Sequence, residues 1–474
     1  MKSDTIFAPA TATGSAAGIG IIRISGERAI SITTNIFPAL TQMKSHTICY
    51  GFLVDGEEVL DEVMVSLMKA PRSYTCEDIV EINCHGGIRV IKRIMLALIK
   101  YGARLAEPGE FTKRAFLNGR IDLSQATAVC DIITAENDIA LRSGLRQLAG
   151  SVRETIKSIR AEIMHEVSFI EAVLDDPDGY PDTAVREVGI IAIIDQVSQL
   201  LQMAKQGKIL KDGINTVIIG KPNVGKSSLF NRLLSEERAI VTDIAGTTRD
   251  ALHEMVLLGE VMLKIVDTAG IRDSDDPIEA KGVERTIGHI EAADLVIFML
   301  DSSLPIDDDD RRIAALLADK RVIIMMNKSD LRGDGLLRYA RNDESGIVDK
   351  TFPHVDEIGK LLVENNVDKQ AIIHASMKNG EGIKELEEMI TKMFINSDIN
   401  EQEAVYITNV RHIEAMDAAH ASMENVRRGL SERVPEDLLT IDMMDAYTSL
   451  GKIIGEAVED DLIEEIFANF CLGK

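Results

Sequence analysis

The sequence contains no tryptophan, and aromatic residues make up only 4% of its 474 residues. A surface that binds nucleic acid by stacking bases on aromatic rings therefore has few residues to draw on. The five cysteines are scattered and include no Cys-x-x-Cys pair, which argues against a zinc ribbon or a disulfide framework. These absences indicate a protein whose thiols stay reduced.

Long apolar runs are missing as well. No segment approaches the run of about 18 apolar residues that marks a membrane-spanning helix, and the first residues lack the apolar core of a signal peptide. We therefore expect a soluble, cytoplasmic protein with no membrane anchor. Hydrophobic residues still make up 45% of the chain, too many for a disordered protein. The length suggests about three domains.

Positive charge is in short supply and unevenly placed. The chain has 52 Lys and Arg against 77 Asp and Glu, a net charge of -25. Residues 1–120 hold 14 basic and 12 acidic residues, so the acidity belongs to the rest of the chain. A protein that binds nucleic acid alone needs a basic face. If this chain acts on nucleic acid, we expect a partner to supply that face.

Segments with different patterns of apolar residues follow one another along the chain. Residues 1–120 contain short apolar runs separated by turn signals, and we predict strands at 19–24, 64–68 and 79–82 and a helix at 88–99. From about residue 121 the apolar positions step by 4 and 3, from Leu141 to Leu174. This spacing predicts one long helix that ends before Pro177, and a second helix is predicted at 190–210.

Strands and helices alternate from about residue 214. Predicted strands at 216–219, 262–266, 295–300 and 322–326 are typical of a parallel α/β sheet. Helical patterns return after residue 394, at 437–450 and 455–470, so the α/β unit is inserted between two helical stretches. We interpret the polar segment 331–370 as an insertion in that unit, and the acidic run 307–310 as a solvated loop rather than a metal site.

A phosphate-binding motif opens the α/β unit. Residues 220–227 read Gly-Lys-Pro-Asn-Val-Gly-Lys-Ser, which fits G-x-x-x-x-G-K-[ST] between a predicted strand and a predicted helix. The glycines let backbone amides face phosphate oxygens, and the helix N-terminus favours their charge. Lys226 would reach the β- and γ-phosphates, and Ser227 would bind Mg²⁺.

Three further motifs follow at strand ends, in the order of a guanine-nucleotide-binding domain. In residues 267–270 (Asp-Thr-Ala-Gly), Asp267 can bind Mg²⁺ through a water molecule, and the Gly270 amide can donate to the γ-phosphate. Residues 327–330 (Asn-Lys-Ser-Asp) carry a carboxylate that can accept from N1 and N2 of guanine, a donor pair that adenine lacks. Residues 376–378 fall where a loop supports the purine. The domain resembles those of the translation-factor-related GTPases.

The expected GTP-binding residues lie in these motifs and in the loop between them. They are Asn223, Val224, Gly225, Lys226, Ser227, Ser228, Thr242, Asp243, Ile244, Ala245, Gly246, Thr247, Thr248, Asp267, Thr268, Ala269, Gly270, Asn327, Lys328, Asp330, Ser376, Met377 and Lys378. Thr248 is the expected second Mg²⁺ ligand after Ser227. Met377 stands where alanine is usual, and we expect this to alter packing rather than base choice.

Catalysis needs a group that this pattern does not supply. Ile271 stands where a Ras-like enzyme has its water-orienting glutamine, and an apolar side chain cannot orient water. An acid downstream is the expected replacement, and spacing alone cannot choose among several candidates: Asp273, Asp275, Asp276, Glu279 and Glu284. The loop at 243–250, with Asn223, could hold a monovalent cation that supplies the charge of an arginine finger.

Motifs outside the nucleotide site carry a more specific signal. They include Asp-Thr-Ile at 4–6, Gly-Ile-Ile-Arg-Ile-Ser-Gly at 20–26, Tyr-Thr-Cys-Glu-Asp at 74–78, Pro-Gly-Glu-Phe-Thr at 108–112, Arg-Ala-Phe-Leu-Asn-Gly-Arg at 114–120 and Cys-Leu-Gly-Lys at 471–474. With the nucleotide motifs, they extend over both ends of the chain. The sequence as a whole resembles the MnmE (TrmE) family of tRNA-modification GTPases.

The resemblance implies a fold and a division of the chain. It implies an α+β folate-binding and dimerisation domain at 1–120, a helical domain in two parts at 121–212 and 395–474, and an inserted Ras-like P-loop α/β GTPase domain at 213–394. It implies a homodimer that works with MnmG, an FAD-containing partner, in a heterotetramer or larger complex. That complex would add an aminomethyl or carboxymethylaminomethyl group to carbon 5 of the wobble uridine of certain tRNAs.

The resemblance also implies roles for individual residues. Arg23, Glu81, Arg120 and Lys474 would bind a one-carbon tetrahydrofolate, in its 5-formyl or 5,10-methylene form. Potassium would lie against Asn223, Thr242, Ile244 and Thr247 and stimulate hydrolysis, and Glu279 would orient the attacking water. Without the resemblance, Arg23 and Arg120 would be interpreted as ordinary surface cations.

Other interpretations stay open. The chain could be a GTP-switched module of ribosome or RNA assembly, although its acidic C-terminus lacks the basic RNA-binding module usual there. A scaffold with an inactive nucleotide site is disfavoured by the intact Lys226 and Ser227. Cys84 and His85 could suggest a nucleophile or a metal site, but we expect a buried structural thiol. Cys471 is either inert or reaches a pocket, and it fits a lipidation box poorly.

Overall fold

The computed structural model describes the chain except for residues 1–3, 13–16, 177–186, 236–252, 260, 267–286, 319, 332–371, 395–406, 457–462, 464–465, 469, 471–472 and 474. It divides into two compact units. The first comprises Met1–Ala135, Leu141–Ala204 and Ile407–Lys474, and the second comprises Glu136–Ala140 and Lys205–Tyr406. Within the described ranges, no helix is both long and apolar enough to cross a membrane.

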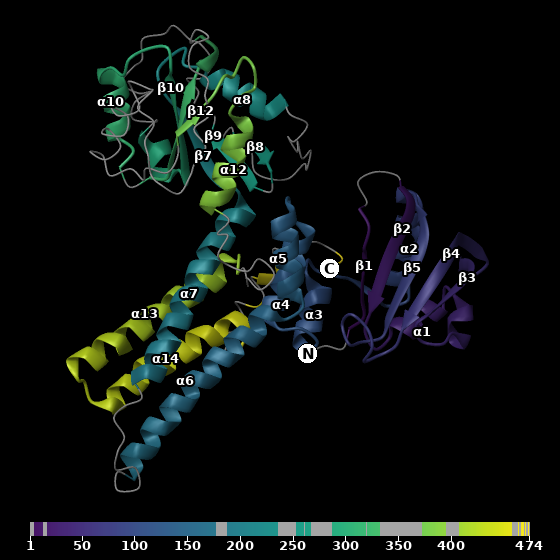
Figure 1. Cartoon of the computed structure of the whole chain (residues 1–474). Coiled ribbons are helices and arrows are strands. Elements are labelled where there is room, and N and C mark those ends of the chain that lie inside the picture. Colours follow the sequence, from purple (N-terminus) through teal and green to yellow (C-terminus); the bar gives the residue numbers. More distant parts are fainter. Residues whose placement is uncertain are drawn as a thin grey trace. The chain divides into compact units, whose positions relative to one another are not determined.

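The first unit begins with a six-stranded sheet in the order β3-β4-β5-β2-β1-β6, antiparallel except where β1 meets β6 (Figure 1). Its strands are β1 (Ile6–Pro9), β2 (Ala17–Ser25), β3 (Thr47–Asp55), β4 (Glu58–Met68), β5 (Ile79–Gly86) and β6 (Arg104–Leu105). The three predicted strands are confirmed as parts of β2, β4 and β5. Strands β1, β3 and β6 were not predicted from the sequence.

One face of this sheet is covered by helices. Alternate residues such as Ile22, Val65 and Ile82 point to the covered face, because side chains on a strand alternate between its faces. They pack with Ile94 and Leu98 of α2 (Ile88–Lys100), which confirms the predicted helix at 88–99. Two shorter helices, α1 (Ala29–Thr34) and the 3₁₀ helix η1 (Pro38–Gln42), complete this cover.

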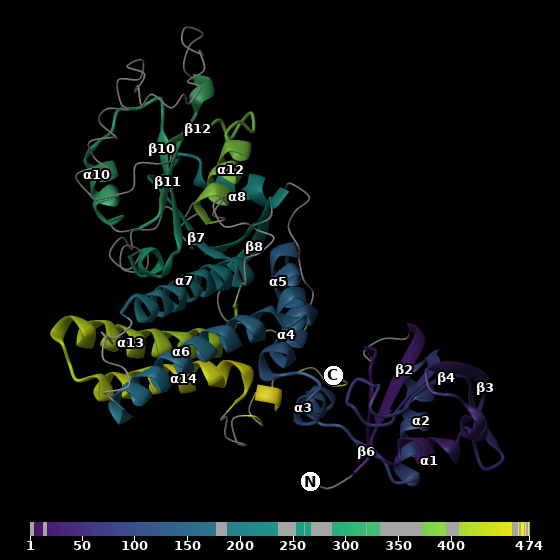
Figure 2. The same cartoon turned by 60° about the horizontal axis from the view of Figure 1, so that its bottom comes forward.

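The rest of the first unit is helical. Its helices are α3 (Glu110–Leu117), α4 (Leu123–Ile133), α6 (Ser151–Asp175), α13 (Val410–Glu432) and α14 (Glu436–Ile454). It also contains most of α5 (Asp138–Leu148) and α7 (Glu187–Asp212), whose residues 138–140 and 205–212 belong to the second unit. Helix α14 packs against α13 and against α6, and Figures 1 and 2 show them side by side. The Arg160 guanidinium of α6 lies 4.0 Å from the Tyr447 ring of α14. Two stretches far apart in the sequence thus build one helical layer.

The single long helix predicted from Leu141 to Leu174 is wrong. The structure has two helices, α5 and α6, separated at Gly150, whose φ of +100° lies in the left-handed region. Glycine adopts this conformation without the penalty that a Cβ brings, so the chain can end one helix and begin the next there. The apolar spacing continues across the break and does not report it. Helix α6 ends at Asp175, before Pro177, as expected.

The second unit is a six-stranded sheet in the order β12-β11-β10-β7-β9-β8. Its strands are β7 (Ile214–Ile219), β8 (His253–Leu258), β9 (Val261–Val266), β10 (Leu295–Asp301), β11 (Val322–Asn327) and β12 (Ile372–His374). All neighbouring pairs are parallel except β8 and β9. The parallel α/β sheet is therefore confirmed, with an antiparallel edge strand that was not predicted.

Helices cover this sheet and bury both of its faces. They are α8 (Lys226–Ser235), α10 (Asp308–Ala315) and α12 (Ile383–Phe394), and the short 3₁₀ helix η2 (Ser329–Leu331) follows β11 without burying a residue. Every residue of β10 and β11 is buried, as expected for strands covered on both sides. The proposed insertion at 331–370 lies outside the described residues beyond Leu331.

The acidic run at 307–310 is not the solvated loop that we expected. Asp307 caps the N-terminus of α10 by accepting from the amides of Asp309 and Asp310, and Asp310 is buried. Acids are stabilising there, because the first turn of a helix carries unpaired amides and the positive end of its dipole. The spacing of Asp307 and Asp310 is that of a capping box, a signal that the sequence analysis did not use.

Candidate functional site

The phosphate loop connects β7 to α8, and its two glycines lie very close to residues of β10 and β11. At Gly220 (φ +146°) a Cβ would overlap the carbonyl oxygen of Met299, and at Gly225 (φ +107°) it would overlap the Asn327 side-chain amide. Both motif glycines are thus required by φ and by space. The loop ends at Lys226, the first residue of α8, so the free amides of that helix face the loop.

The Lys226 side chain lies along the loop. Its Nζ donates to the carbonyl oxygens of Gly220 at 2.9 Å and Lys221 at 2.7 Å. Ser227 and Ser228 follow in the first turn of α8, and Asn223 has a left-handed φ of +63°. This combination of loop amides, one ammonium group and hydroxyls fits the oxygens of a polyphosphate and a hard divalent cation.

Asn327 connects the phosphate loop to the two segments expected at the base. Its buried side-chain Nδ2 donates to the Val224 carbonyl oxygen at 2.7 Å, and its Oδ1 accepts from the Met377 amide at 3.0 Å. The ends of β7, β11 and β12 lie at one edge of the sheet, so residues of three distant segments meet there.

The residues expected to bind the base contact their neighbours. Asp330 Oδ1 accepts from the Ser376 hydroxyl at 2.8 Å, and the Lys378 ammonium lies 3.9 Å from its other oxygen. The Met377 side chain is buried among core residues of this unit. That placement agrees with the expectation that Met377 affects packing, since the residue contributes its backbone amide to the site.

A second group of residues lies on the two central strands of the N-terminal sheet, β2 and β5, and on segments near them in the first unit. Arg23 of β2 faces Glu81 of β5, and its Nε is 2.7 Å from the carboxylate. The guanidinium of Arg23 is 5.7 Å and that of Arg120 4.7 Å from the centre of the Tyr74 ring. Arg23 also donates to the carbonyl oxygen of Gly473 at 3.4 Å. Two guanidinium groups and an aromatic ring fit a planar, anionic ligand.

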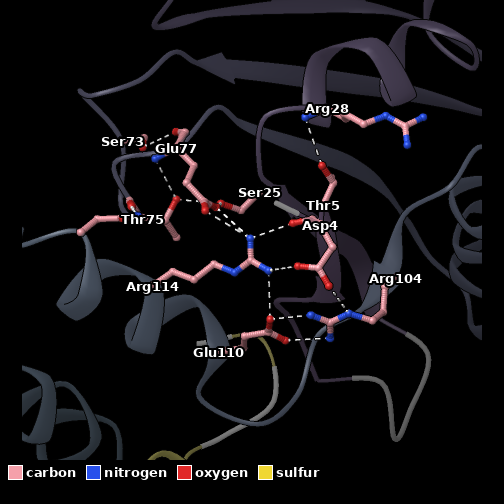
Figure 3. A network of polar contacts seen from close by, with 11 residues as sticks. Asp4, Thr5, Ser25, Arg28, Ser73, Thr75, Glu77, Arg104, Glu110 and Arg114 are labelled. Carbon is pink, nitrogen blue, oxygen red and sulfur yellow. Dashed lines mark hydrogen bonds and ion pairs between the residues drawn. The ribbon is translucent and has the colours of Figure 1, made fainter. Parts of the chain in front are cut away.

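A polar network supports this second group (Figure 3). The guanidinium of Arg114 on α3 contacts Asp4, Glu77 and Glu110 at 2.9–3.2 Å. Arg104 contacts Asp4 and Glu110 from the other side. Hydrogen bonds from Arg104, with Arg114 nearby, hold the pKa of the Asp4 carboxyl below its ordinary value.

Through Glu77 this network reaches the segment that carries Tyr74. The Glu77 carboxylate accepts from Ser25 at 2.7 Å, and Ser25 in turn lies 2.7 Å from the Thr75 hydroxyl. The Tyr74 hydroxyl lies 2.9 Å from Thr112 of α3. Tyr74 is thus fixed between two arginines by contacts with β2 and α3, and sequence reasoning gave it no role.

Comparison with known proteins gives a family for the whole chain. Residues 5–120 match a family model described as the GTP-binding protein TrmE N-terminus, and residues 123–471 match one described as the MnmE helical domain. The chain belongs to the MnmE family. This confirms the resemblance found in the sequence, and with it the three-part α+β, helical and P-loop α/β fold class.

Relatives in this family match along their full length. The tRNA modification GTPase MnmE of Lachnoclostridium phytofermentans is 45% identical, and that of Acetivibrio thermocellus is 43% identical, each over 100% of both chains. Among solved structures, a variant of Aquifex aeolicus Era bound to GDP and AlF₄⁻ is 27% identical. That match covers 44% of this chain and 66% of the Era chain, with a TM-score of 0.28.

Several expected MnmE site residues lie outside the described ranges. They are Thr242, Asp243, Ile244, Ala245, Gly246, Thr247, Thr248, Asp267, Thr268, Ala269, Gly270, Glu279 and Lys474. The structure brings together Asn223, Lys226, Asn327 and Asp330 in one unit. Arg23 and Glu81 meet in the other, with Arg120 exposed beside them.

The structure adds an acid that no motif predicted. Asp301, at the end of β10, lies 2.7 Å from the Lys328 ammonium and accepts from Ser303 at 2.5 Å. Burial raises the pKa of the Asp301 carboxyl, but the hydrogen bonds from Lys328 and Ser303 outweigh it and leave the pKa below its ordinary value. An acid at the carboxyl end of a buried strand was the signal available in the sequence.

Cys84 is the buried structural thiol that we expected. Its Sγ lies 3.3 Å from the Gly20 carbonyl oxygen, and burial, with the nearby Asp61 charge, raises the pKa of the thiol to about 11. A thiol with this pKa stays protonated and is a poor nucleophile or metal ligand. Among the described residues, no three His, Cys, Asp or Glu side chains are grouped closely enough to hold a metal ion.

Proposed function

We propose that this chain binds and hydrolyses GTP and that hydrolysis serves tRNA modification, the role given in the names of its full-length relatives. The observation that carries the proposal is the position of Asn327. Its side chain hydrogen-bonds to the phosphate loop and to the 376–378 segment at once. Asn327 thus links the proposed phosphate-binding end of the site to the proposed base-binding end. It can do so only because both segments lie within hydrogen-bond distance of its side chain.

We propose the following division of labour for hydrolysis. Lys226 would contact the β- and γ-phosphates, Ser227 and Thr248 would bind Mg²⁺, and the bound ion would offset negative charge on the phosphates. Asn223, Thr242, Ile244 and Thr247 would hold potassium. The Glu279 carboxylate would accept a hydrogen bond from the attacking water and orient it, because Ile271 cannot.

The second polar group is proposed as the tetrahydrofolate site. Arg23 and Arg120 offer two cations beside the Tyr74 ring, which suits the carboxylates and the flat ring system of a folate. Glu81 would accept from ring N–H groups and Lys474 would add a further cation. Bound folate supplies the one-carbon unit, and an MnmG-type partner supplies FAD, for the aminomethyl-type group at carbon 5 of the wobble uridine.

The proposal extends to the organisation of the protein. We propose domain boundaries at 1–120, 121–212, 213–394 and 395–474, a homodimer formed by the N-terminal domains, and action in the cytoplasm. The near-neutral N-terminal region and the acidic remainder favour a partner that supplies basic surface to the tRNA.

The test is GTP hydrolysis at matched ionic strength in KCl and in NaCl, for the wild type and for Glu279→Ala. We expect faster hydrolysis in KCl, lost in the variant while GTP binding is kept. Equal rates in both salts would reject the potassium site, and a fully active Glu279→Ala would reject the role of Glu279. Binding of tetrahydrofolate, measured by calorimetry, separates the modification enzyme from a GTP-switched assembly module.

A further inference from the structure

Lys221 occupies a position that the phosphate-loop motif leaves unspecified, yet its side chain has defined partners. Its Nζ lies 2.6 Å from Asp307 Oδ2 and 2.7 Å from Asp310 Oδ2, and the side chain is only 17% exposed. Both carboxylates belong to the start of α10, which no nucleotide motif includes. One lysine thus joins the phosphate loop to a helix 86 residues further along the chain.

The charges at this contact depend on one another. The Asp310 side chain is 4% exposed, and Asp307 and Asp310 accept from each other's backbone amides in the capping box. The ammonium of Lys221 compensates both carboxylates. Removing one partner of a buried ion pair leaves the other charge without compensation, which costs more than the pair contributes.

The backbone of Lys221 has a separate contact within the loop. Its carbonyl oxygen accepts from the Nζ of Lys226 at 2.7 Å. The side chain of Lys221 therefore fixes the peptide that meets the phosphate-binding lysine. At the start of the loop Gly220 lies close to the Met299 carbonyl oxygen, and at its end Asn327 donates to the Val224 carbonyl oxygen. Lys221 holds the stretch between these two points.

We infer that the ion pair of Lys221 with Asp310 and Asp307 positions the phosphate loop in its binding shape before a nucleotide arrives. This rests on the proposed GTP-binding function and adds positioning residues that touch no nucleotide. A loop that is already ordered loses less conformational entropy on binding. Both GDP and GTP place a β-phosphate in the loop, so the ion pair strengthens the binding of both.

Nucleotide affinity measured on a double-mutant cycle tests this inference. The probes are methylanthraniloyl-GDP and methylanthraniloyl-GppNHp, and the variants are Lys221→Met, Asp310→Asn, the double variant and Lys221→Arg. We expect each single variant to bind both probes about tenfold more weakly. The double variant should bind no more weakly than Lys221→Met, because Lys221→Met already removes the contact with Asp310, and Lys221→Arg should restore most of the affinity.

Asp309→Asn is the matched control. Asp309 is the next acid on the same helix, but it is 68% exposed and pairs only with exposed Arg312 among the described residues. It should change affinity by less than about twofold, as expected for a surface pair. The melting temperature of each nucleotide-free variant shows whether the fold is kept, and the rescue by Lys221→Arg distinguishes lost positioning from general damage.

Three results would contradict this inference. Lys221→Met could bind both probes as tightly as the wild type, the single effects could multiply to about a hundredfold in the double variant, or Lys221→Arg could fail to rescue. In each case the wild type still binds and the proposed function stands. A wild type that binds neither probe would reject the proposed function itself, and the inference with it.

Discussion

Asp301 carries the first prediction at the scale of single residues. Replacing it with asparagine removes the charge that holds the Lys328 ammonium at 2.7 Å, so Lys328 loses its fixed position beside the base site. We expect Asp301→Asn to weaken GDP binding by roughly three- to tenfold, measured by calorimetry. Asp294→Asn is the control, because Asp294 precedes β10 at its other end and accepts from the Asn215 amide. Equal effects of the two variants would contradict a role specific to Asp301.

The pH dependence of this contact follows from the sign of the shift. The pKa of Asp301 lies below its ordinary value, so the pair is present above that ordinary value and is lost only as pH falls through the lowered pKa. The contribution of Asp301 to binding should therefore be constant from about pH 6 to about pH 8.

His85 offers a direct test of an exposed ion pair. The hydrogen bond that His85 Nδ1 makes to the Asp61 carboxylate, followed by the Asp61 charge, raises the pKa of the His85 imidazole. Any stabilisation from this pair is complete below the ordinary histidine pKa and disappears as pH rises through the raised value. We expect an NMR titration to give a pKa for His85 above its ordinary value, and Asp61→Asn to lower it. The same midpoint in both proteins would show that the pair does not form in solution.

Single residues were predictable from sequence where a motif fixes both chemistry and backbone. The motif singled out Asn327 and Asp330, and the structure places Asn327 against the phosphate loop and Asp330 against Ser376, while their role at a base stays a prediction. Asp301 and the ion pair of Lys221 with Asp310 were not singled out, because neither partner is unusual alone. Their meaning comes from a contact between segments that only the folded sheet brings together.

At the scale of elements, the turn between α5 and α6 gives a prediction of stability. Gly150 has a φ of +100°, a region where a Cβ costs about 1–2 kcal/mol. Gly150→Ala should lower the free energy of unfolding by about that amount, measured by urea denaturation. Gly18→Ala is the control, because its Cβ would meet no atom within 4 Å and its φ is not left-handed. If Gly150→Ala were as stable as the wild type, the left-handed conformation at residue 150 would not be required for the turn between α5 and α6.

The same turn shows what an apolar pattern can and cannot predict. The stripe from Leu141 to Leu174 correctly located helical residues. It forms the buried face of α6, where Val152, Ile156 and Ile163 are buried, but Leu141 and Leu145 of α5 are exposed. It could not locate the break, since a pattern of side chains carries no information on the sign of a single φ. Strands β1 and β6 were missed for a different reason. They contain four and two residues, too few for alternation to stand out.

At the scale of the whole molecule, the return of helical texture after residue 394 correctly indicated two helical stretches packed together. What it could not show is that Gly473 lies against β1 and β2. Gly473 has no side chain that could mark it as a site residue, yet its backbone carbonyl oxygen accepts a hydrogen bond from Arg23, 450 residues earlier. Contacts at this sequence separation leave no local signal in either segment.

Gly473 therefore tests whether the two ends of the chain act together. Its φ is +90°, and a Cβ there would overlap the carbonyl oxygen of Pro9. Valine at this position should push the backbone at residue 473 away from Pro9 and free one donor of Arg23, which still has Glu81. If the Arg23 group binds tetrahydrofolate, Gly473→Val should weaken that binding by about tenfold or more, measured by calorimetry.

Guanine nucleotide binding is the internal control for Gly473→Val, because the nucleotide site lies in the other unit of the chain. It should be unchanged, which would show that the variant is folded. Loss of both ligands would indicate that Gly473→Val is unfolded. Gly473→Ala is the second variant for that case, because it adds a single carbon at the same overlap. It should weaken folate binding less than valine does. Unchanged folate binding in both variants would mean that the contact of Gly473 with Arg23 is no part of the folate site. Arg23 would then bind its ligand with Glu81 and Arg120 alone.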